Sequence, residues 1–300
     1  MSIASVDAAS RVQNFAATAR GLAELAKPRL SSLVLFTSGI GYWLGSPGAL
    51  DWIGMLATLV GAALAATGAN TLNQWVECPL DMKMKRTAAR PLPSGRVTPG
   101  QALAFGWLTI FAGWLLLDQV VNGLAANLAL LVAVLYVALY TPLKRRSSLC
   151  TIVGAVCGAL PPLIGWAGAA GSLSAAAWVL FGILFLWQIP HFLAIDWYHR
   201  EDYARGGFAM VSKVDPSGAM SGRQAVIYCL ALLPISLAAT PLGLAGPLYA
   251  AGALLLGLGF TWLAVVMYRE RTDQAARRLF LGSLAYLPLL LLLLVVDPTR

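Results

Sequence analysis

Long stretches without a charged residue constrain the fold of this chain most strongly. No Asp, Glu, Lys or Arg occurs in residues 30–50 or in residues 52–76. A transmembrane α-helix needs about 20 consecutive, mostly apolar residues to cross the hydrocarbon core of a bilayer. Charged residues make up 11% of the chain, against about 25% in an average soluble domain. These runs therefore indicate a polytopic membrane protein rather than a water-soluble fold.

The apolar runs between charged or Gly/Pro-rich breaks predict an all-α protein that crosses the membrane repeatedly. We expect nine transmembrane helices, at about residues 30–46, 53–73, 102–118, 124–142, 149–167, 175–195, 224–240, 247–267 and 279–296. The connections after the odd-numbered helices are short and almost uncharged. No folded part of the protein is expected on that side of the membrane.

Positive charge gathers on one side of this predicted arrangement. Of the 21 Lys and Arg residues, all but Arg300 fall before the first span or in the connections after the second, fourth, sixth and eighth spans. Lys and Arg are enriched in cytoplasmic loops, so the pattern predicts an odd number of spans and a cytoplasmic N-terminus. The net charge of +8 is then a topology signal, and no binding to nucleic acid is expected.

The chain is expected to form one domain. Residues 1–26 are interpreted as an N-terminal cytoplasmic segment, and residues 27–297 as a single transmembrane domain with functional loops at 73–100 and 196–223. The first segment lacks the apolar core of a secretory signal and carries acidic residues, which favours a bacterial cytoplasmic membrane over a mitochondrial inner membrane. The four cysteines form no CxxC pair, so they are interpreted as buried thiols without a redox or zinc-binding role.

The connection after the second predicted span places oxygen ligands beside cations. Asn73, Glu77 and Asp81 are spaced at i, i+4 and i+8, on one face of a helix, although Pro79 is expected to kink or end that helix near Glu77. Such ligands at the mouth of a membrane cavity favour Mg²⁺, which binds through carboxylates together with substrate phosphates and water. Three cations follow: Lys85, Arg86 and Arg90. The alternative is a solvated loop in which these charges neutralise one another.

The connection after the sixth span is the second candidate for a functional loop. On a helix, a histidine, a phenol and a carboxylate would share one stripe: His191, Tyr198 and Asp202. His191 lies just inside the predicted span, where an ionisable group indicates a functional site, and the alternative is a hydrogen-bonded histidine of the core. Asp196 and Glu201 in the same segment are interpreted as surface charges.

A third cluster closes the fourth predicted span. Tyr140 and Thr141 are followed by three cations, Lys144, Arg145 and Arg146. Cations at a cytoplasmic helix end determine topology. At the depth of the other two loops, they are also able to hold a phosphate or a carboxylate. The sequence supports both interpretations.

These segments carry motifs that resemble a known family. In chain order they are Lys27-Pro28-Arg29, Asn73-x-x-x-Glu77-x-x-x-Asp81, Met84-x-Arg86-Thr87-x-x-Arg90-Pro91, Tyr140-Thr141-x-Leu143-Lys144-Arg145, Trp187-Gln188-x-Pro190-His191-Phe192, Asp202-Tyr203 and Gly206-Gly207. Together, over about residues 22–296, they resemble the intramembrane prenyltransferases of the UbiA superfamily. The glutamate at position 77 and the Pro-His-Phe sequence at 190–192 resemble its haem O synthase branch.

The resemblance implies nine helices around a central cavity, with two acidic loops that bind a prenyl diphosphate through Mg²⁺. The implied metal ligands are Asn73, Glu77, Asp81 and Asp202, and the implied diphosphate-binding cations are Lys85, Arg86, Arg90, Lys144, Arg145 and Arg205. Tyr198 stands where an aspartate would complete a second acidic pair, which favours one Mg²⁺ ion. The metal ligands, His191 and Tyr198 are the implied catalytic residues, and His191 is implied to contact haem as an axial ligand or as a base.

The haem O branch implies an enzyme that transfers the farnesyl group of farnesyl diphosphate to a vinyl group of haem B (protohaem IX). Water addition then gives haem O, and diphosphate is released. The implied partners are membrane lipid and either haem A synthase or terminal oxidase assembly factors. Two other functions stay open. A sister prenyltransferase that acts on an aromatic quinone precursor would share the diphosphate loops, and a non-catalytic carrier of haem or a small anion would share the helices.

Overall fold

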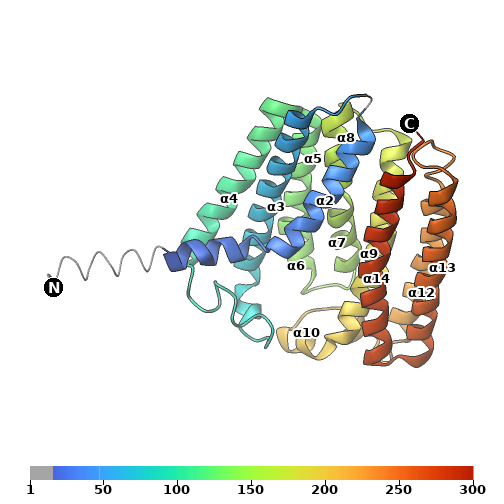
Figure 1. Ribbon diagram of the computed structural model, residues 1–300. Coiled ribbons are helices and arrows are strands. Elements are labelled where there is room, and N and C mark those ends of the chain that lie inside the picture. Colours follow the sequence, from blue (N-terminus) through green and yellow to red (C-terminus); the bar gives the residue numbers. More distant parts are fainter. Residues whose placement is uncertain (1–15, 47, 300) are drawn as a thin grey trace, which may run out of the picture.

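The computed structural model describes residues 16–46 and 48–299, and within them it contains helices and no strand. Residues 16–25 are helical and lie across the bundle (Figure 1). The other elements are α2 (Pro28–Gly45), α3 (Trp52–Asp81), α4 (Pro99–Leu116), η1 (Leu117–Val121), α5 (Gly123–Val134), η2 (Leu135–Tyr140), α6 (Thr141–Leu143), α7 (Cys150–Ala159), α8 (Pro161–Ala170), α9 (Ala175–Tyr198), α10 (Arg200–Gly206), α11 (Val211–Val214), α12 (Ala219–Leu237), α13 (Pro247–Glu270) and α14 (Asp273–Val296). The predicted all-α fold is confirmed. Residues 1–15 of the predicted N-terminal segment lie outside the described residues.

Eight helical segments of the described chain are long and apolar enough to cross a bilayer. They are Trp52–Asp81, Pro99–Val121, Gly123–Leu143, Cys150–Ala170, Ala175–Tyr198, Ala219–Leu237, Pro247–Glu270 and Asp273–Val296. The protein is therefore a multi-pass membrane protein. The first predicted span corresponds to α2, which has 18 residues and is not among these eight. The count of nine spans and the cytoplasmic N-terminus stay predictions.

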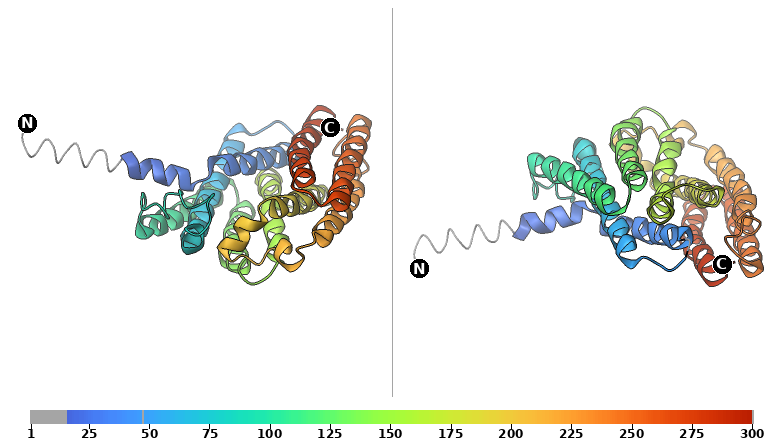
Figure 2. Two further views of the ribbon diagram at one scale, coloured as in Figure 1. Left: turned by 90° about the horizontal axis from the view of Figure 1, so that it is seen from below. Right: turned by 90° about the horizontal axis from the view of Figure 1, so that it is seen from above.

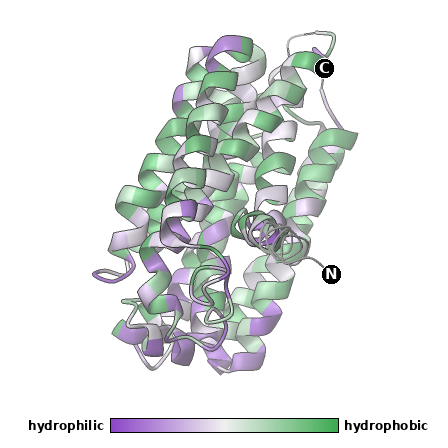
Figure 3. Ribbon diagram, turned by 90° about the vertical axis from the view of Figure 1, so that its left-hand side faces the viewer, coloured by the Kyte–Doolittle hydropathy of each residue, from purple (hydrophilic) through white to green (hydrophobic). Residues whose placement is uncertain are grey.

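The charged connections lie together at one end of the bundle. In Figure 1 the connections after α3, α6, α9 and α13 are at the lower end, and Figure 3 shows hydrophilic residues gathered at that end below the apolar helices. Seen along the bundle, α3 and α4 lie on one side and α12 and α13 on the other, with α9 between them (Figure 2). The two functional loops predicted from the sequence therefore face the same side of the protein.

Capping residues explain why several helices begin before their apolar runs. Thr98 and Gln101 form a reciprocal capping box, so α4 begins at Pro99 rather than at the predicted residue 102. Thr272 accepts a hydrogen bond from the backbone N–H of Ala275, so α14 begins at Asp273 rather than at residue 279. Polar first turns thus extend helices that hydropathy alone makes too short.

Pro79 and Pro161 differ in their effect, and only Pro161 breaks a predicted helix. Helix α3 does not end near Glu77, because it continues through Pro79 to Asp81. Pro79 lies in the last turn, so little of the helix follows the hydrogen bond that it removes. The span predicted at 149–167 is two helices, α7 and α8, that meet at Leu160, because Pro161 occupies the first position of α8.

Glycine allows close contact between helices that frame the site. A Cβ atom at Gly165 of α8 would collide with the backbone carbonyl oxygen of Ser38 in α2. The Ser38 hydroxyl donates a hydrogen bond to the Pro161 carbonyl at 3.0 Å across the same contact. Similarly, a Cβ atom at Gly68 of α3 would collide with the carbonyl oxygen of Gly106 in α4. Such small-residue contacts stabilise helix pairs in membranes, where apolar burial between helices contributes little.

The Gly165→Ala substitution is expected to destabilise the protein by about 1–3 kcal/mol, because overpacking forces the two backbones apart. The matched control is Gly259→Ala in α13, where an added Cβ meets no atom within 4 Å. Thermal unfolding in detergent, followed by the labelling of the buried thiols of Cys150, Cys157 and Cys229, measures both variants. Equal unfolding temperatures for the two variants would contradict the close contact between α2 and α8.

Candidate active site

The last turns of α3 carry three buried polar side chains on one face. Asn73, Glu77 and Asp81 are 1%, 4% and 0% exposed. Their common face is the one that the i, i+4, i+8 spacing predicts. The Asn73 amide accepts a hydrogen bond from Lys27 Nζ (3.2 Å) and donates one to Thr141 Oγ1 (3.0 Å). Asn73 therefore joins α3 to the residue before α2 and to α6.

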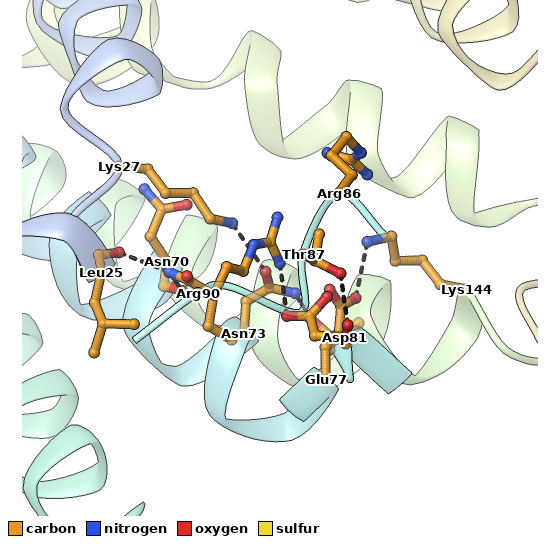
Figure 4. A network of polar contacts seen from close by, with 12 residues as sticks. Leu25, Lys27, Asn70, Asn73, Glu77, Asp81, Arg86, Thr87, Arg90 and Lys144 are labelled. Carbon is orange, nitrogen blue, oxygen red and sulfur yellow. Dashed lines mark hydrogen bonds and ion pairs between the residues drawn. The ribbon is translucent and has the colours of Figure 1, made fainter. Parts of the chain in front are cut away.

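A cation from another segment pairs with each carboxylate of this face. Lys144 Nζ lies 2.8 Å from Glu77 Oε1, and Arg90 Nη1 lies 2.7 Å from Asp81 Oδ2. Figure 4 shows Lys27, Arg90 and Lys144 converging on the same face of α3. Because three cationic side chains surround two carboxylates, the cluster is suited to an added anion such as a diphosphate.

The pKa values of the two lysines of the cluster are shifted in opposite directions. At Lys27, burial and the nearby cations Arg90 and Lys144 lower the pKa to about 7. At Lys144, burial also lowers the pKa, but the carboxylate of Glu77 outweighs it and the pKa is raised above its usual value. A bound anion would favour the charged form of Lys27, because an opposite charge close by stabilises an ammonium group.

One carboxylate oxygen of Asp81 has no hydrogen-bond partner in the part of the chain that the structure describes. This oxygen, Oδ1, is buried. Leaving a buried acceptor unpaired is unfavourable, and a hard divalent cation takes such a carboxylate oxygen as a ligand. The oxygens of Asn73 and Glu77 on the same face make the donor set suitable for Mg²⁺. In the described chain, no three His, Cys, Asp or Glu side chains gather at metal-binding spacing, so Asp202 does not join Glu77 and Asp81 in one cluster.

The helix at residues 16–25 positions Lys27. The backbone carbonyls of Leu25 and Ala26 accept hydrogen bonds from the side chains of Gln74 (2.8 Å) and Asn70 (3.5 Å) on α3. Lys27 has a left-handed φ of 48°, a conformation that residues other than glycine rarely adopt. The chain turns there from this helix into α2, and the Lys27 ammonium reaches Asn73. Sequence reasoning used Lys27 only as an interface marker and a family motif, so its contact with Asn73 was missed.

The connection after α3 is tied back onto the site. The Thr87 hydroxyl donates a hydrogen bond to the backbone carbonyl of Asp81 at 2.9 Å, and Arg90 follows in position to pair with the Asp81 carboxylate. Further along, the Arg96 guanidinium binds both carboxylate oxygens of Glu24 at 2.6 and 3.2 Å. The connection therefore lies between the N-terminal helix and the end of α3.

Asp202 of α10 joins the second connection to the first. Its Oδ1 accepts hydrogen bonds from the Lys85 backbone N–H (3.3 Å) and from Arg205 Nη2 (2.7 Å), and its Oδ2 lies 4.0 Å from Arg86 Nε. Partial burial raises the pKa of Asp202, but these hydrogen bonds and cations outweigh it, so the pKa lies below its usual value. A cleft of about 500 Å³ opens beside it, lined by Lys85, Arg86, Tyr198, His199, Arg200, Glu201, Asp202, Arg205 and Asp273.

The predicted stripe of His191, Tyr198 and Asp202 is wrong. Helix α9 ends at Tyr198 and α10 begins a new helix at Arg200, so the periodicity of α9 does not continue to Asp202. Tyr198 is 43% exposed and lines the cleft beside Asp202. The side chain of His191, on α9, instead contacts α14, where its Nδ1 lies 2.6 Å from Ser283 Oγ.

The structure corrects the interpretation of Asp196. Asp196 is not a surface charge, because it is 2% exposed and accepts hydrogen bonds from the backbone N–H (2.8 Å) and hydroxyl (2.6 Å) of Ser212. It thereby fastens α11 to the end of α9. Arg145 is exposed and forms no ion pair with any described acid, whereas its neighbour Lys144 reaches Glu77, and the role of Arg145 beside the diphosphate stays a prediction. Glu201 is exposed, as predicted.

An apolar cavity of about 230 Å³ adjoins the polar cluster. Small side chains on α3, α5 and α7 leave this space open. The cavity is lined by Val34, Ala62, Ala65, Ala66, Ala69, Asn70, Ala129, Val132, Ala133, Tyr136, Tyr140, Gly154, Cys157, Gly158, Pro161, Ile164, Gln188 and Phe192. The ring of Tyr140 lies 5.1 Å from Lys144 Nζ. Tyr140 therefore lies between the apolar cavity and a cation of the charged cluster.

Residues 34–290 match the UbiA prenyltransferase family. The chain belongs to this family. A protoheme IX farnesyltransferase of Solibacter usitatus is 48% identical over 287 residues, which cover 93% of this chain and 98% of that protein. The human mitochondrial protoheme IX farnesyltransferase is 43% identical over 274 residues, which cover 91% of this chain and 61% of the human protein. This UbiA-family chain is accordingly a prenyltransferase of the membrane.

Solved structures share the fold of this UbiA-family chain at low sequence identity. Digeranylgeranylglyceryl phosphate synthase superposes with a TM-score of 0.79 at 18% identity, covering 93% of this chain and 98% of that one. A UbiA homolog from Archaeoglobus fulgidus, bound to DMAPP and Mg²⁺, has a TM-score of 0.64 at 13% identity, covering 92% of this chain and 99% of that one. These likenesses establish the UbiA fold.

Proposed function

We propose that this protein transfers the farnesyl group of farnesyl diphosphate to a vinyl group of haem B, with addition of water, and so makes haem O and diphosphate. The observation that carries the proposal is an acid-and-cation cluster next to an apolar cavity, with Tyr140 lining the cavity and contacting Lys144 of the cluster. It supplies both parts of a prenyl diphosphate site, one for the diphosphate and one for the chain. The similarity over nearly the full length to proteins named protoheme IX farnesyltransferase favours haem as the acceptor.

We propose Mg²⁺ as the cofactor, held by Asn73, Glu77 and Asp81, with Asp202 joining through the diphosphate. The unpartnered Oδ1 of Asp81 supports this assignment. When bound, Mg²⁺ supplies Lewis-acid stabilisation of the leaving diphosphate. The UbiA homolog that binds DMAPP and Mg²⁺ supports the same pairing of metal and diphosphate.

The side chains of the cluster would bind and orient the diphosphate. Lys27, Arg90 and Lys144 converge on the acidic face and are placed to hold its oxygens, with Lys85, Arg86 and Arg205 at the adjoining cleft. Cations fixed where negative charge develops favour cleavage of the bond between farnesyl C1 and oxygen. The diphosphate leaves with the electron pair of that bond.

The cavity would hold the farnesyl chain and protect the allylic cation. Tyr136 and Tyr140 line it and stack at a centroid distance of 5.1 Å, and aromatic faces attract a cation. The apolar wall excludes water until a haem vinyl carbon has attacked farnesyl C1. The cation left beside the porphyrin then takes up water and releases a proton, which gives the hydroxyl group of haem O.

We place the protein in the bacterial cytoplasmic membrane, with residues 27–297 acting as one transmembrane domain. Its proposed surroundings are membrane lipid and either haem A synthase or terminal oxidase assembly factors. These proteins would receive haem O as it leaves the cavity, because the product is too apolar to cross the cytoplasm unaided.

The deciding experiment incubates detergent-purified protein with haem B, farnesyl diphosphate and Mg²⁺, followed by mass analysis of the extracted haem. A mass gain of one farnesyl and one hydroxyl group is expected. Farnesyl diphosphate consumed only when an aromatic quinone precursor is added would contradict haem as the acceptor and favour the sister prenyltransferase. Folded protein that leaves both substrates intact would favour a carrier.

The Lys27→Met substitution is expected to raise the KM for farnesyl diphosphate about 10- to 100-fold, because a hydrogen bond to a charged group contributes about 1.5–3 kcal/mol. Initial rates of diphosphate release, measured across substrate concentrations, provide the test. Arg96→Met is the matched control, since the contacts of Arg96 are an exposed ion pair with Glu24 and exposed hydrogen bonds to Ser94 and the Ala89 carbonyl, and exposed ion pairs contribute little. An equal rise in KM for both variants would show that Lys27 does not hold the diphosphate.

A further inference from the structure

Gln188 on α9 places an unpaired amide oxygen in the apolar cavity. Its side chain is 5% exposed and lines the cavity together with Phe192 of the same helix. Its Nε2 donates a hydrogen bond to the backbone carbonyl of Leu184 at 3.0 Å, which is the only hydrogen bond of this side chain within the described part of the protein. The acceptor Oε1 is therefore without a partner there, which is unfavourable for a buried amide.

The cavity leaves space beside this oxygen. Fully enclosed side-chain atoms without a hydrogen-bond partner occur in the described chain at Asp81, Trp114, Trp197 and Ser221, and Gln188 is not among them. Its Oε1 therefore faces the open space of the cavity that the side chain lines. An amide oxygen in this position is able to bind a small molecule that donates a hydrogen bond.

Two glycines of α7 bring the Gln188 amide close to the phenol of Tyr140. A Cβ atom at Gly158 would collide with Gln188 Oε1, and a Cβ atom at Gly154 would collide with the ring of Tyr140. Positions i and i+4 are neighbours on one face of a helix, with about 5–6 Å between their Cβ atoms. Tyr140 also lines the cavity, and its hydroxyl has no hydrogen-bond partner among the described residues. The amide and the phenol thus flank one region of the cavity.

The chemistry of the proposed reaction leaves water as the partner for this oxygen. An amide oxygen accepts hydrogen bonds, so it needs a donor. The farnesyl chain and the haem vinyl group carry no N–H or O–H group, and ionised diphosphate and haem propionates only accept. Water donates to Gln188 Oε1 and gains a second partner in the Tyr140 hydroxyl, as a buried water requires two to four polar partners.

We infer that Gln188, together with Tyr140, binds the water molecule that adds to the cation left by farnesyl transfer. The inference rests on the proposed function, since this cation forms only after a haem vinyl group has attacked farnesyl C1. An electron pair of the water oxygen then forms the new carbon–oxygen bond, and the released proton passes to diphosphate, the base that the reaction sets free. Because this one molecule is fixed at Gln188, the apolar wall still keeps bulk water from the allylic cation.

Without this water, the cation loses a proton from the adjacent CH₂ group and becomes an alkene. That product keeps the farnesyl group but lacks the elements of water. The test incubates the purified full-length protein with haem B, farnesyl diphosphate and Mg²⁺, and mass analysis gives the ratio of dehydrated to hydroxylated product. Gln188→Leu is expected to raise this ratio about tenfold, the effect of losing one hydrogen bond to the reacting water.

Two further variants separate the binding of water from the shape of the cavity. Phe192→Leu is the matched control, because it places a leucine at the same cavity, one turn further along α9, without removing a polar group. Its product ratio is expected to equal that of the wild type. Tyr140→Phe removes the second partner of the water but keeps the ring beside Lys144, and it is expected to raise the ratio about two- to tenfold.

The possible outcomes distinguish this inference from the proposed function. If folded Gln188→Leu gives farnesylated haem at the wild-type ratio, the inference is overturned and the proposed function stands. Folded Gln188→Leu that transfers no farnesyl group also overturns it, because Gln188 would then act before water adds. If Gln188→Leu does not fold, an unchanged ratio in Tyr140→Phe overturns it. A wild-type protein that leaves haem unmodified overturns both.

Discussion

Replacing Asp81 with asparagine is expected to lower kcat for farnesyl transfer by about 10²- to 10³-fold, the effect of removing one preorganised charged group from a reaction centre. Asp81 is fully buried, pairs with Arg90 and presents an unpartnered Oδ1. Asparagine keeps the shape of the side chain but removes the negative charge that pairs with Arg90 and that the proposed Mg²⁺ ion requires. The rate of haem O formation under saturating substrates measures the effect.

The control for Asp81→Asn is Asp118→Asn. Asp118 lies in η1, away from the cluster, where it accepts a hydrogen bond from Gln119. Both variants should retain the folded fraction of the wild type in size-exclusion chromatography. Near-normal turnover by folded Asp81→Asn would remove Asp81 from the metal site. A loss of the same size in Asp118→Asn would show that the effect is not specific.

Hydropathy predicted the membrane helices well because the bilayer imposes a one-dimensional rule on the chain. Each run of about 20 apolar residues is long enough to cross the hydrocarbon core, so α3, α9 and α13 were found from the sequence. The rule says nothing of the polar first turn of α14, where Thr272 caps the helix. The rule also does not predict the break at Leu160, which Pro161 causes in an otherwise continuous apolar run.

Local spacing also predicted the acidic face of the site. Asn73, Glu77 and Asp81 lie on one helix, so the helical repeat alone determines that they share a face. The partners of site residues come from far along the chain. Lys27 is 46 residues from Asn73, and Ser283 is 92 residues from His191. No local periodicity links such pairs, which depend on how the helices pack.

The failed stripe of His191, Tyr198 and Asp202 has the same physical origin. The spacing is correct for one continuous helix, but His199 has a backbone φ of −110° and separates α9 from α10. Two of the three carboxylates of this segment then differ in role. Asp196 fastens the backbone at Ser212, while Asp202 turns to the connection after α3. A sequence pattern does not distinguish a carboxylate that caps a loop from one that meets a substrate.

Replacing Asp202 with asparagine is expected to lower kcat/KM for farnesyl diphosphate by about 10²-fold, within the range for loss of one fixed charge at a reaction centre. Asp202 Oδ1 accepts hydrogen bonds from the Lys85 backbone N–H at 3.3 Å and from Arg205 Nη2 at 2.7 Å. Its carboxylate therefore keeps the connections after α3 and α9 together over the cleft. Without that charge, the cations of the two connections repel each other and no longer converge on the diphosphate.

Glu201 offers a matched control for Asp202 because it is the adjacent acid, it lines the same cleft and it is exposed. Glu201→Gln removes the same charge from the protein but leaves the contacts of Lys85 and Arg205 intact, so less than about a twofold change is expected, as for other exposed charges. Diphosphate release at low substrate concentration compares the two variants. Equal losses would mean that the cleft acts only through its overall charge, and the specific bridge between the two connections would then be wrong.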